Sequence, residues 1–273
     1  MRRALLDIAF DVSAQDPALD AYFGLLYDAF PTTARDAVVR LRILTRPDGT
    51  GSLEIDDEIP IAAVSPARLV DVSVHHLNQR LLARLDALVL HAGAVEHRGR
   101  AIVLPATMES GKTTLTAGLV RAGCRYFTDE GTIVRWGTET VVGYPKPLSL
   151  DPGSWALFPE LEPEADLDDP GYKAGQWQVP PSAFRADAVA APAPVGLVVF
   201  PQYAPDAPVE LEPVARAEAV IELARNTFRF DEQARAALDQ LARIARGATC
   251  WRLRGGSLAG LVDAVLGLAE REG

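Results

Sequence analysis

Lys112 is the residue whose surroundings most clearly predict a chemistry. Only three of the 27 basic residues are lysines. This one lies in a segment with the spacing of a phosphate-binding loop, Ala106-Thr107-Met108-Glu109-Ser110-Gly111-Lys112-Thr113-Thr114, in which alanine replaces the first glycine of the G-x-x-x-x-G-K-[ST] pattern. An apolar run at 101–104 precedes the loop and a helical pattern begins near Thr113. The motif therefore has the strand–loop–helix context of a nucleotide site.

The loop predicts which groups would hold the phosphates. Backbone N–H groups of residues 106–114, together with the N-terminus of the following helix, would surround them. Lys112 would reach the β- and γ-phosphates, and the Thr113 hydroxyl would bind magnesium. Glu109 adds a negative charge to this anion site unless it points outward or faces the metal ion. The alternative is an ordinary turn before a helix, with a lysine there by chance.

Two adjacent carboxylates, Asp129 and Glu130, follow Lys112 by 17 and 18 residues. That interval is just long enough for one helix, a turn and a strand, so the end of the strand is expected beside the loop. Adjacent residues of a strand point in opposite directions, which gives the two carboxylates different roles. One would approach the metal ion, directly or through water, and the other would accept a proton from an attacking hydroxyl. The alternative is a surface turn.

His91 precedes the loop on the neighbouring strand of a tight hairpin, and the residues alone fit a core histidine and a functional one equally. The remaining histidines are expected in structural or surface roles: His75, His76 and His97. Three further basic side chains are candidates for additional phosphate contacts, with a solvated surface position as the alternative: Lys146, Lys173 and Arg185.

The composition narrows the class of protein. The chain has 273 residues, 48% of them hydrophobic, enough for a full core. A formal net charge of −10 argues against nucleic acid as the main partner. Cys124 and Cys250 are predicted to be buried, small apolar residues of a protein in a reducing compartment. Neither has a second cysteine or histidine at the spacing of a zinc site. No signal peptide or membrane helix is predicted, so we expect a cytoplasmic protein without a membrane partner.

The hydrophobic pattern predicts a small N-terminal α+β lobe at 1–64 and a main domain at 65–273. The elements expected in the lobe are a strand at 4–12, a helix at 17–30 and a hairpin of 37–45 with 52–55. The main domain is expected to begin with a helix that Ser65 caps and that runs from Pro66 to Leu85. Further strands are expected at 88–95, 101–104, 124–128, 132–136, 140–144, 195–200 and 249–253, and further helices at 113–122, 216–228, 232–246 and 258–268. Gly123 is expected to end the first of these helices. The acidic segment 151–169 is expected to be an exposed loop, or else a docking surface for a basic peptide.

Several segments together resemble the HPr kinase/phosphorylase family and its shorter HprK-related serine kinases. The matching segments are His91–Val95, Ala106–Thr113, Arg121–Tyr126 and Thr128–Glu130 in the region of about 85 to 150, and Tyr144–Leu150, Pro180-Pro181 and Phe200–Tyr203 in the shorter kinases. The chain departs from the family in two places. Its loop has fewer glycines, and the later signature of the family, which contains glycine and arginine, is not found, since Gly255-Gly256 is a poor substitute for it.

The resemblance implies an α/β fold with a P-loop core like that of PEP carboxykinase, a mixed sheet flanked by helices. It implies ATP and Mg²⁺ as nucleotide and cofactor. Asp129 looks like the catalytic base of the family, Glu130 like the second acid near magnesium, and His91 like the histidine that lines the phosphate site. Some relatives accompany peptide-modification clusters, such as those for lasso peptides, where they phosphorylate a hydroxyl of the precursor.

The leading hypothesis is therefore a kinase that phosphorylates a hydroxyl, taken as serine, on a peptide or small protein. One alternative is a nucleotide-binding partner without catalysis in a biosynthetic or regulatory complex. Another is a small-molecule kinase that acts, for instance, on free serine. Relatives in this family often assemble, so a homo-oligomer is one open alternative, but the residues themselves do not predict an oligomeric state.

Overall fold

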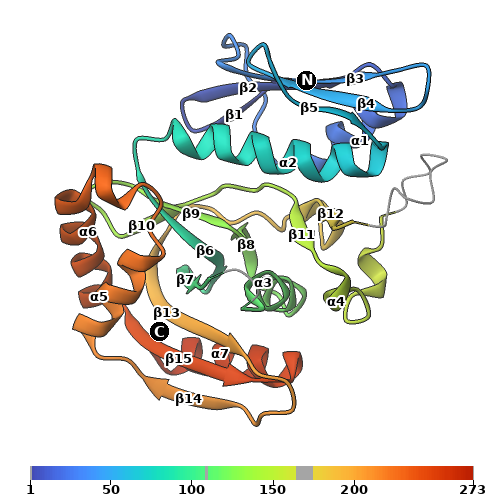
Figure 1. The fold of residues 1–273 in the computed structure, drawn as a ribbon. Helices are drawn as coiled ribbons and strands as arrows, with labels where there is room; N and C mark the ends of the chain where they lie inside the picture. The colour runs from blue at the N-terminus through green and yellow to red at the C-terminus, as the bar shows by residue number, and fades with distance from the viewer. Residues whose placement is uncertain (1, 108–109, 164–174, 273) are drawn as a thin grey trace. The chain divides into compact units, whose positions relative to one another are not determined.

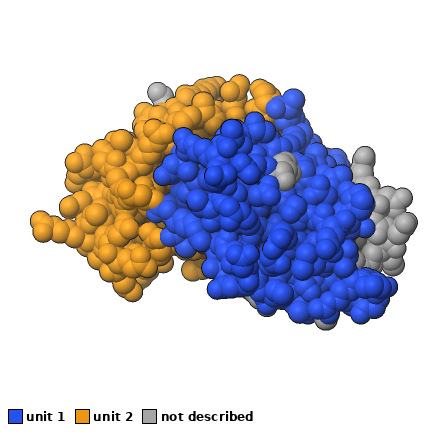
Figure 2. Space-filling view, turned by 90° about the horizontal axis from the view of Figure 1, so that it is seen from above, with its two compact units in different colours: residues 1–85, 145–186 blue, residues 86–144, 187–273 orange. Residues whose placement is uncertain are grey.

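The computed structural model describes residues 2–107, 110–163 and 175–272, whose elements Figure 1 labels. The chain forms two compact units, coloured in Figure 2: unit 1 comprises residues 1–85 and 145–186, and unit 2 comprises residues 86–144 and 187–273. This division differs from the expected lobes at 1–64 and 65–273. The helix after Ser65 packs on the N-terminal sheet, and residues 145–186 return to that unit, where Gln178 O accepts a hydrogen bond from the Tyr22 hydroxyl at 3.1 Å.

Unit 1 contains a five-stranded sheet with two helices. The strands lie in the order of the chain: β1 (Arg2–Leu5), β2 (Ile8–Ala14), β3 (Val39–Thr45), β4 (Gly51–Ile55) and β5 (Glu58–Val64). The helices are α1 (Pro17–Leu26), which Asp16 caps by accepting from Leu19 N, and α2 (Pro66–Ala83), which Ser65 caps by accepting from Arg68 N. The β3–β4 hairpin and the Ser65 cap confirm the predictions.

Three predictions for unit 1 were wrong in detail. The single strand at 4–12 is two antiparallel strands, because the chain turns at Leu6, whose φ is 53°. The helix predicted to end at residue 30 ends at Leu26. Strand β5 was missed, since its Pro60 argues against a strand in a reading by propensity.

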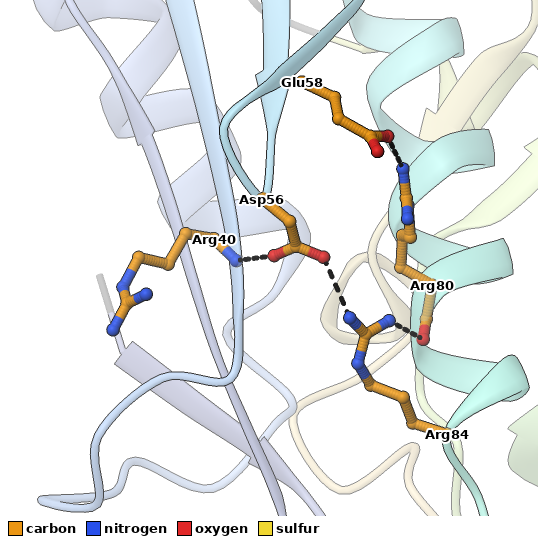
Figure 3. Close-up of polar contacts among 5 residues, drawn as sticks. All are labelled: Arg40, Asp56, Glu58, Arg80 and Arg84. Atoms are coloured by element: carbon orange, nitrogen blue, oxygen red, sulfur yellow. Dashed lines mark hydrogen bonds and ion pairs between the residues drawn. The ribbon is translucent and has the colours of Figure 1, made fainter.

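The turn between β4 and β5 connects this hairpin to α2, as Figure 3 shows. Asp56 has a φ of 50°, as the tight turns of two-residue hairpins require. Its carboxylate accepts from the Arg40 backbone N at 2.9 Å and from Arg84 Nη2 at 3.0 Å. Glu58, the first residue of β5, pairs with Arg80. The hairpin is thus held to the C-terminal half of α2 by partly exposed charges.

Residues 145–186 add a small two-stranded sheet to unit 1. It pairs β11 (Leu148–Leu150) with β12 (Trp177–Val179) in antiparallel register. The acidic segment that was predicted to be a loop begins with a short helix, α4 (Pro152–Trp155), in which Trp155 stacks on Trp177 with ring centroids 4.8 Å apart. Four of its acidic residues lie outside the described residues: Glu164, Asp166, Asp168 and Asp169.

Unit 2 is built on an eight-stranded mixed sheet of order β10-β9-β6-β7-β13-β15-β14, with β8 beside β6. The strands are β6 (Leu88–His97), β7 (Arg100–Pro105), β8 (Arg125–Thr128), β9 (Gly131–Val134), β10 (Thr140–Val142), β13 (Ala193–Tyr203), β14 (Glu210–Pro213) and β15 (Thr249–Gly255). Strands β7, β13 and β15 are parallel, so their carboxyl ends meet at one edge. That edge is where ligands bind in open α/β sheets.

Helices cover both faces of this sheet. On one face α3 (Lys112–Arg121) packs on β6 and on α7 (Leu258–Glu272). On the other face α5 (Arg216–Arg225) and α6 (Ala234–Gly247) close a core that includes Ala92 and Ala94. The prediction of an α/β fold with a mixed sheet flanked by helices is confirmed, as is Gly123 at the end of α3, where φ is 108°.

Both cysteines are buried and neither is in a disulfide, in line with the prediction that they act as small apolar side chains. Over the stretches that the structure describes, no helix combines the length and the apolar character needed to cross a membrane.

Candidate functional site

The predicted site residues meet in a row across three neighbouring strands of unit 2. Ala92 of β6 is the register partner of Pro105, the last residue of β7. On its other side, Ala92 N donates to Glu130 O at 3.0 Å, and His91 is the register partner of Gly131. Ala106, the first residue of the loop, donates its N–H to His91 O at 3.4 Å. The row places the start of the loop, His91 and Glu130 at one level of the sheet.

Gly93 explains how α3 comes close enough to add Lys112 to this row. It lies two residues after His91 and therefore faces the same side of the sheet. A Cβ at position 93 would collide with Thr116 Oγ1 and would lie 3.4 Å from Lys112 Cγ. The glycine in His91-Ala92-Gly93 is thus a packing requirement, because only a residue without a side chain lets the first turn of α3 rest on β6.

Lys112 and His91 are in direct contact. Lys112 Nζ lies 3.4 Å from His91 Nε2, and the lysine side chain is only 7% exposed. Burial lowers the pKa of His91, the charge of Lys112 lowers it further, and Glu130 and Asp129 oppose the change by raising it. The imidazole is therefore neutral near pH 7.

Asp129 is held in place by Tyr126. The tyrosine hydroxyl donates to Asp129 Oδ1 at 3.0 Å, and both residues are buried, Asp129 with 2% exposure. Burial raises the pKa of Tyr126 well above its usual value, and the adjacent carboxylate raises it further. The phenol therefore remains a hydrogen-bond donor throughout the physiological range. The spacing of three residues between Tyr126 and Asp129 lets a single strand end carry both the carboxylate and the group that orients it.

The carboxylates lie one strand farther from the loop than expected. Strand β8 and residues 129–130 border β6, so β6 separates them from β7 instead of their lying directly beside the loop. The reason is the hairpin of β6 with β7, which occupies the position next to β7 on this side. Asp129 is buried and Glu130 is partly exposed, in agreement with two different environments for adjacent carboxylates.

The loop itself opens α3 in the predicted manner. Gly111 adopts a φ of 81°, which only glycine takes up without strain, and Lys112 is the first residue of the ten-residue helix. Ser110 Oγ donates to Thr107 O at 2.8 Å, and Thr113 and Thr114 are half-buried in the first turn. The predicted binding residues Met108 and Glu109 lie outside the described residues.

These donors fit the phosphates of a nucleotide. A helix N-terminus presents N–H groups without intrahelical acceptors, and a buried ammonium next to it favours a polyanion. Thr113 and Glu130 have the side-chain oxygens that Mg²⁺ prefers, so these two residues would hold the ion if it binds here. Among the residues that the structure describes, no group of three His, Cys, Asp or Glu side chains gathers as a metal site.

The other predicted candidates belong to several different parts of the chain. Lys146 is buried in unit 1, where its ammonium donates to Pro147 O at 2.9 Å, so it is not a solvated surface cation. Arg185 also belongs to unit 1, and Lys173 lies outside the described residues. His75 and His76 lie in α2 with their rings edge to face, 5.5 Å apart. His97 ends β6, where its Nδ1 lies 3.9 Å from Cys124 Sγ.

Two aromatic residues near the site had been given no role by the motif. Phe228 follows α5 and packs edge to face on the His91 ring, with centroids 5.6 Å apart. Tyr203 ends β13 and donates its backbone N–H to Ser110 O at 3.3 Å. Neither could be placed from the sequence, because both reach the loop through pairings between strands or loops more than 80 residues apart in the chain.

No protein-family model and no curated protein sequence matches this chain. The solved structure of the HPr(Ser) kinase/phosphatase from Coxiella burnetii is similar to it with a TM-score of 0.32 and 13% sequence identity, over 67% of this chain and 95% of that one. At this TM-score the likeness carries no functional argument, and the arrangement of residues in unit 2 is what supports the function proposed next.

Proposed function

We propose that this protein is an ATP- and magnesium-dependent kinase that phosphorylates a hydroxyl, taken as serine, on a peptide or small protein. The observation that supports this proposal is the contact of Lys112 with His91 on β6, the strand that lies between the end of β7 and the Asp129–Glu130 pair. A phosphate-binding loop alone would fit many nucleotide-binding proteins. A loop with two carboxylates and a neutral imidazole at the same level has the groups that phosphoryl transfer needs.

Each residue has a distinct part in this proposal. The first turn of α3 and Lys112 bind and orient the triphosphate, with Thr113 and Glu130 as ligands of Mg²⁺, which neutralises phosphate charge when bound. His91 stays uncharged beside Lys112, because burial and the charge of the lysine lower its pKa. Asp129 accepts the proton of the acceptor hydroxyl, and Tyr126 fixes the direction of its carboxylate.

The peptide acceptor is proposed because the family that the sequence resembles includes kinases that modify precursor peptides in biosynthetic clusters.

The test is transfer of labelled γ-phosphate from ATP to serine-containing candidate peptides. Asp129→Asn should lower transfer by about 10²- to 10⁴-fold, the usual contribution of a general base, while ATP binding is retained. Tyr126→Phe should lower transfer less, by roughly tenfold, because the carboxylate remains but loses its orientation. Wild-type protein that labels no peptide, or an Asp129→Asn protein of full activity, would contradict the proposal.

A second candidate function is nucleotide binding without transfer, in a partner or regulator of a biosynthetic complex. The burial of Asp129 favours it, since a base with 2% exposure must become accessible before it can contact an acceptor. This alternative predicts that ATP raises the melting temperature while neither hydrolysis nor transfer occurs. Transfer that depends on Asp129 would exclude it.

A further inference from the structure

The aromatic side chain of Tyr203 lies exposed against the phosphate-binding loop. Its backbone N–H donates to Ser110 O at 3.3 Å, and a Cβ built on Gly111 would lie 3.3 Å from Tyr203 Cβ. The tyrosine is nevertheless 53% exposed. The proposed phosphoryl transfer assigns the phosphates, the metal ion and the proton to other residues, so it gives this ring no role.

The order of strands places Tyr203 on the opposite side of the loop from the catalytic groups. Strand β7, which leads into the loop, has β6 on one side and β13 on the other. His91, Asp129 and Glu130 are on or beyond β6, whereas Tyr203 ends β13. A triphosphate whose terminal phosphate meets the carboxylates would therefore extend toward β13 with its other end. The nucleoside is the part of the ligand that would reach Tyr203.

Hydrogen bonds and close packing hold the chain around Tyr203 against the end of β15. Ala204 N donates to Gly255 O at 3.0 Å and Gly256 N donates to Ala207 O at 3.1 Å, which joins the loop after β13 to the end of β15. A Cβ on Gly256 would lie 2.7 Å from Ala204 O, so only glycine allows this approach. The exposed Val209 packs against Gly255, the register partner of Tyr203. The result is a partly apolar surface on which the Tyr203 ring and Val209 are exposed.

We propose that Tyr203 is the platform on which the nucleobase stacks, with Val209 forming the apolar edge of the base site. This inference rests on the proposed function, since it assumes that a nucleoside triphosphate binds at the loop. Aromatic rings bind bases by stacking without hydrogen-bond readout, so the platform would add affinity for any base and most for the larger purines. Removing the ring should lower affinity for the nucleotide by about tenfold and leave the phosphate contacts intact.

The experiment compares a ligand that has a base with one that does not. Dissociation constants of ATP and of inorganic tripolyphosphate, each with Mg²⁺, are measured by calorimetry for the wild type and for Tyr203→Ala, Tyr203→Phe and Phe228→Ala. We expect Tyr203→Ala to weaken ATP about tenfold and tripolyphosphate not at all, and Tyr203→Phe to match the wild type. Phe228→Ala is the matched control, because it removes an exposed aromatic ring that borders the same site beside His91.

The possible results separate the two proposals. If Tyr203→Ala weakens both ligands equally or neither, or if Phe228→Ala alone reduces the preference for ATP over tripolyphosphate, the platform is not Tyr203, although the nucleotide site remains. If the wild type binds neither ligand, the proposed function fails and the platform fails with it. Unchanged melting temperatures of the variants confirm that the comparison is made on folded protein.

Discussion

Two charged regions of this protein use the same residue types in opposite ways. At the β4–β5 turn of unit 1, Asp56 with Arg84 and Glu58 with Arg80 remain partly in contact with solvent. In unit 2, Lys112 and Asp129 are almost completely buried. Water weakens an exposed ion pair, whereas a buried charge is costly unless specific partners surround it. The first region therefore holds a hairpin in place, and the second is the region that we propose binds a ligand.

The largest expected effect is the loss of the buried ammonium. Lys112→Met keeps the length of the side chain but removes the charge that would face the phosphates, so ATP binding should fall by at least about 100-fold. Arg80→Met is the matched control, because it removes a cation from the exposed region and should leave binding unchanged. Calorimetric titration with Mg–ATP measures both. Equal losses in the two variants would remove the functional distinction between the regions.

The next effect concerns the contact that brings Lys112 to the sheet. Gly93→Ala should lower the free energy of unfolding by about 1–3 kcal/mol, because the added methyl group collides with Thr116 and forces α3 away from β6. Gly247→Ala, in the same unit but with nothing within 4 Å of the added Cβ, should be neutral or stabilising. Urea denaturation of both variants tests this. A Gly93→Ala protein as stable as the wild type would show that the approach of α3 is not tight.

A smaller effect is expected from the neutral state of His91. Its pKa is lowered in the folded protein, so below about pH 6.5 the unfolded chain binds a proton that the folded chain does not. The stability that this histidine contributes is therefore present above pH 6.5 and is lost as the pH falls through its lowered pKa. Between pH 7 and pH 5 the wild type should lose more stability than His91→Gln. Parallel losses would mean that His91 titrates as it does in the unfolded chain.

The smallest effect belongs to the exposed region. Glu58→Gln should change the free energy of unfolding by no more than about 1 kcal/mol and should not alter ATP binding, because its partner Arg80 remains solvated. Thermal denaturation at low and high salt measures the change. A loss well above this range would place the β4–β5 turn among the main determinants of stability and would bring the two regions closer together.

Local signals in the sequence predicted much of the fold. The Ser65 cap, the Gly123 terminus and the strand–loop–helix around Lys112 were predicted because each depends on a few neighbouring residues. The return of residues 145–186 to unit 1 could not be predicted, because it depends on pairings between distant segments, such as Asp71 in α2 with Gln178 at 3.4 Å. The positive φ of Leu6 also gave no signal, since leucine rarely adopts it.

The candidate site divides in the same manner. Lys112, Asp129 and Glu130 could be proposed from motif and spacing, and His91 from the family resemblance. The structure places Lys112 against His91 and the carboxylates beside the strand that carries His91, while their roles remain a prediction. The sequence shows that Tyr126 lies close to Asp129 in the chain. It does not predict the hydrogen bond between them, because that bond forms only where the chain bends after the end of β8. Tyr203 lies in a segment that carries the resemblance, but neither it nor Phe228 could be given a role, because nothing local indicates which distant aromatic residues border a site.

Strand β6 hydrogen-bonds on one side to β7, which leads into the loop, and on the other to the segment that carries the carboxylates. Side chains alternate along a strand, so a deletion of one residue between Leu88 and His91 would turn the imidazole toward the α5–α6 face. Every residue of the motif would still be present in such a chain, and none would be aligned with its partners. To find homologues or designed variants in which these residues are aligned, the spacing within β6 is therefore a better criterion than the presence of the motif alone.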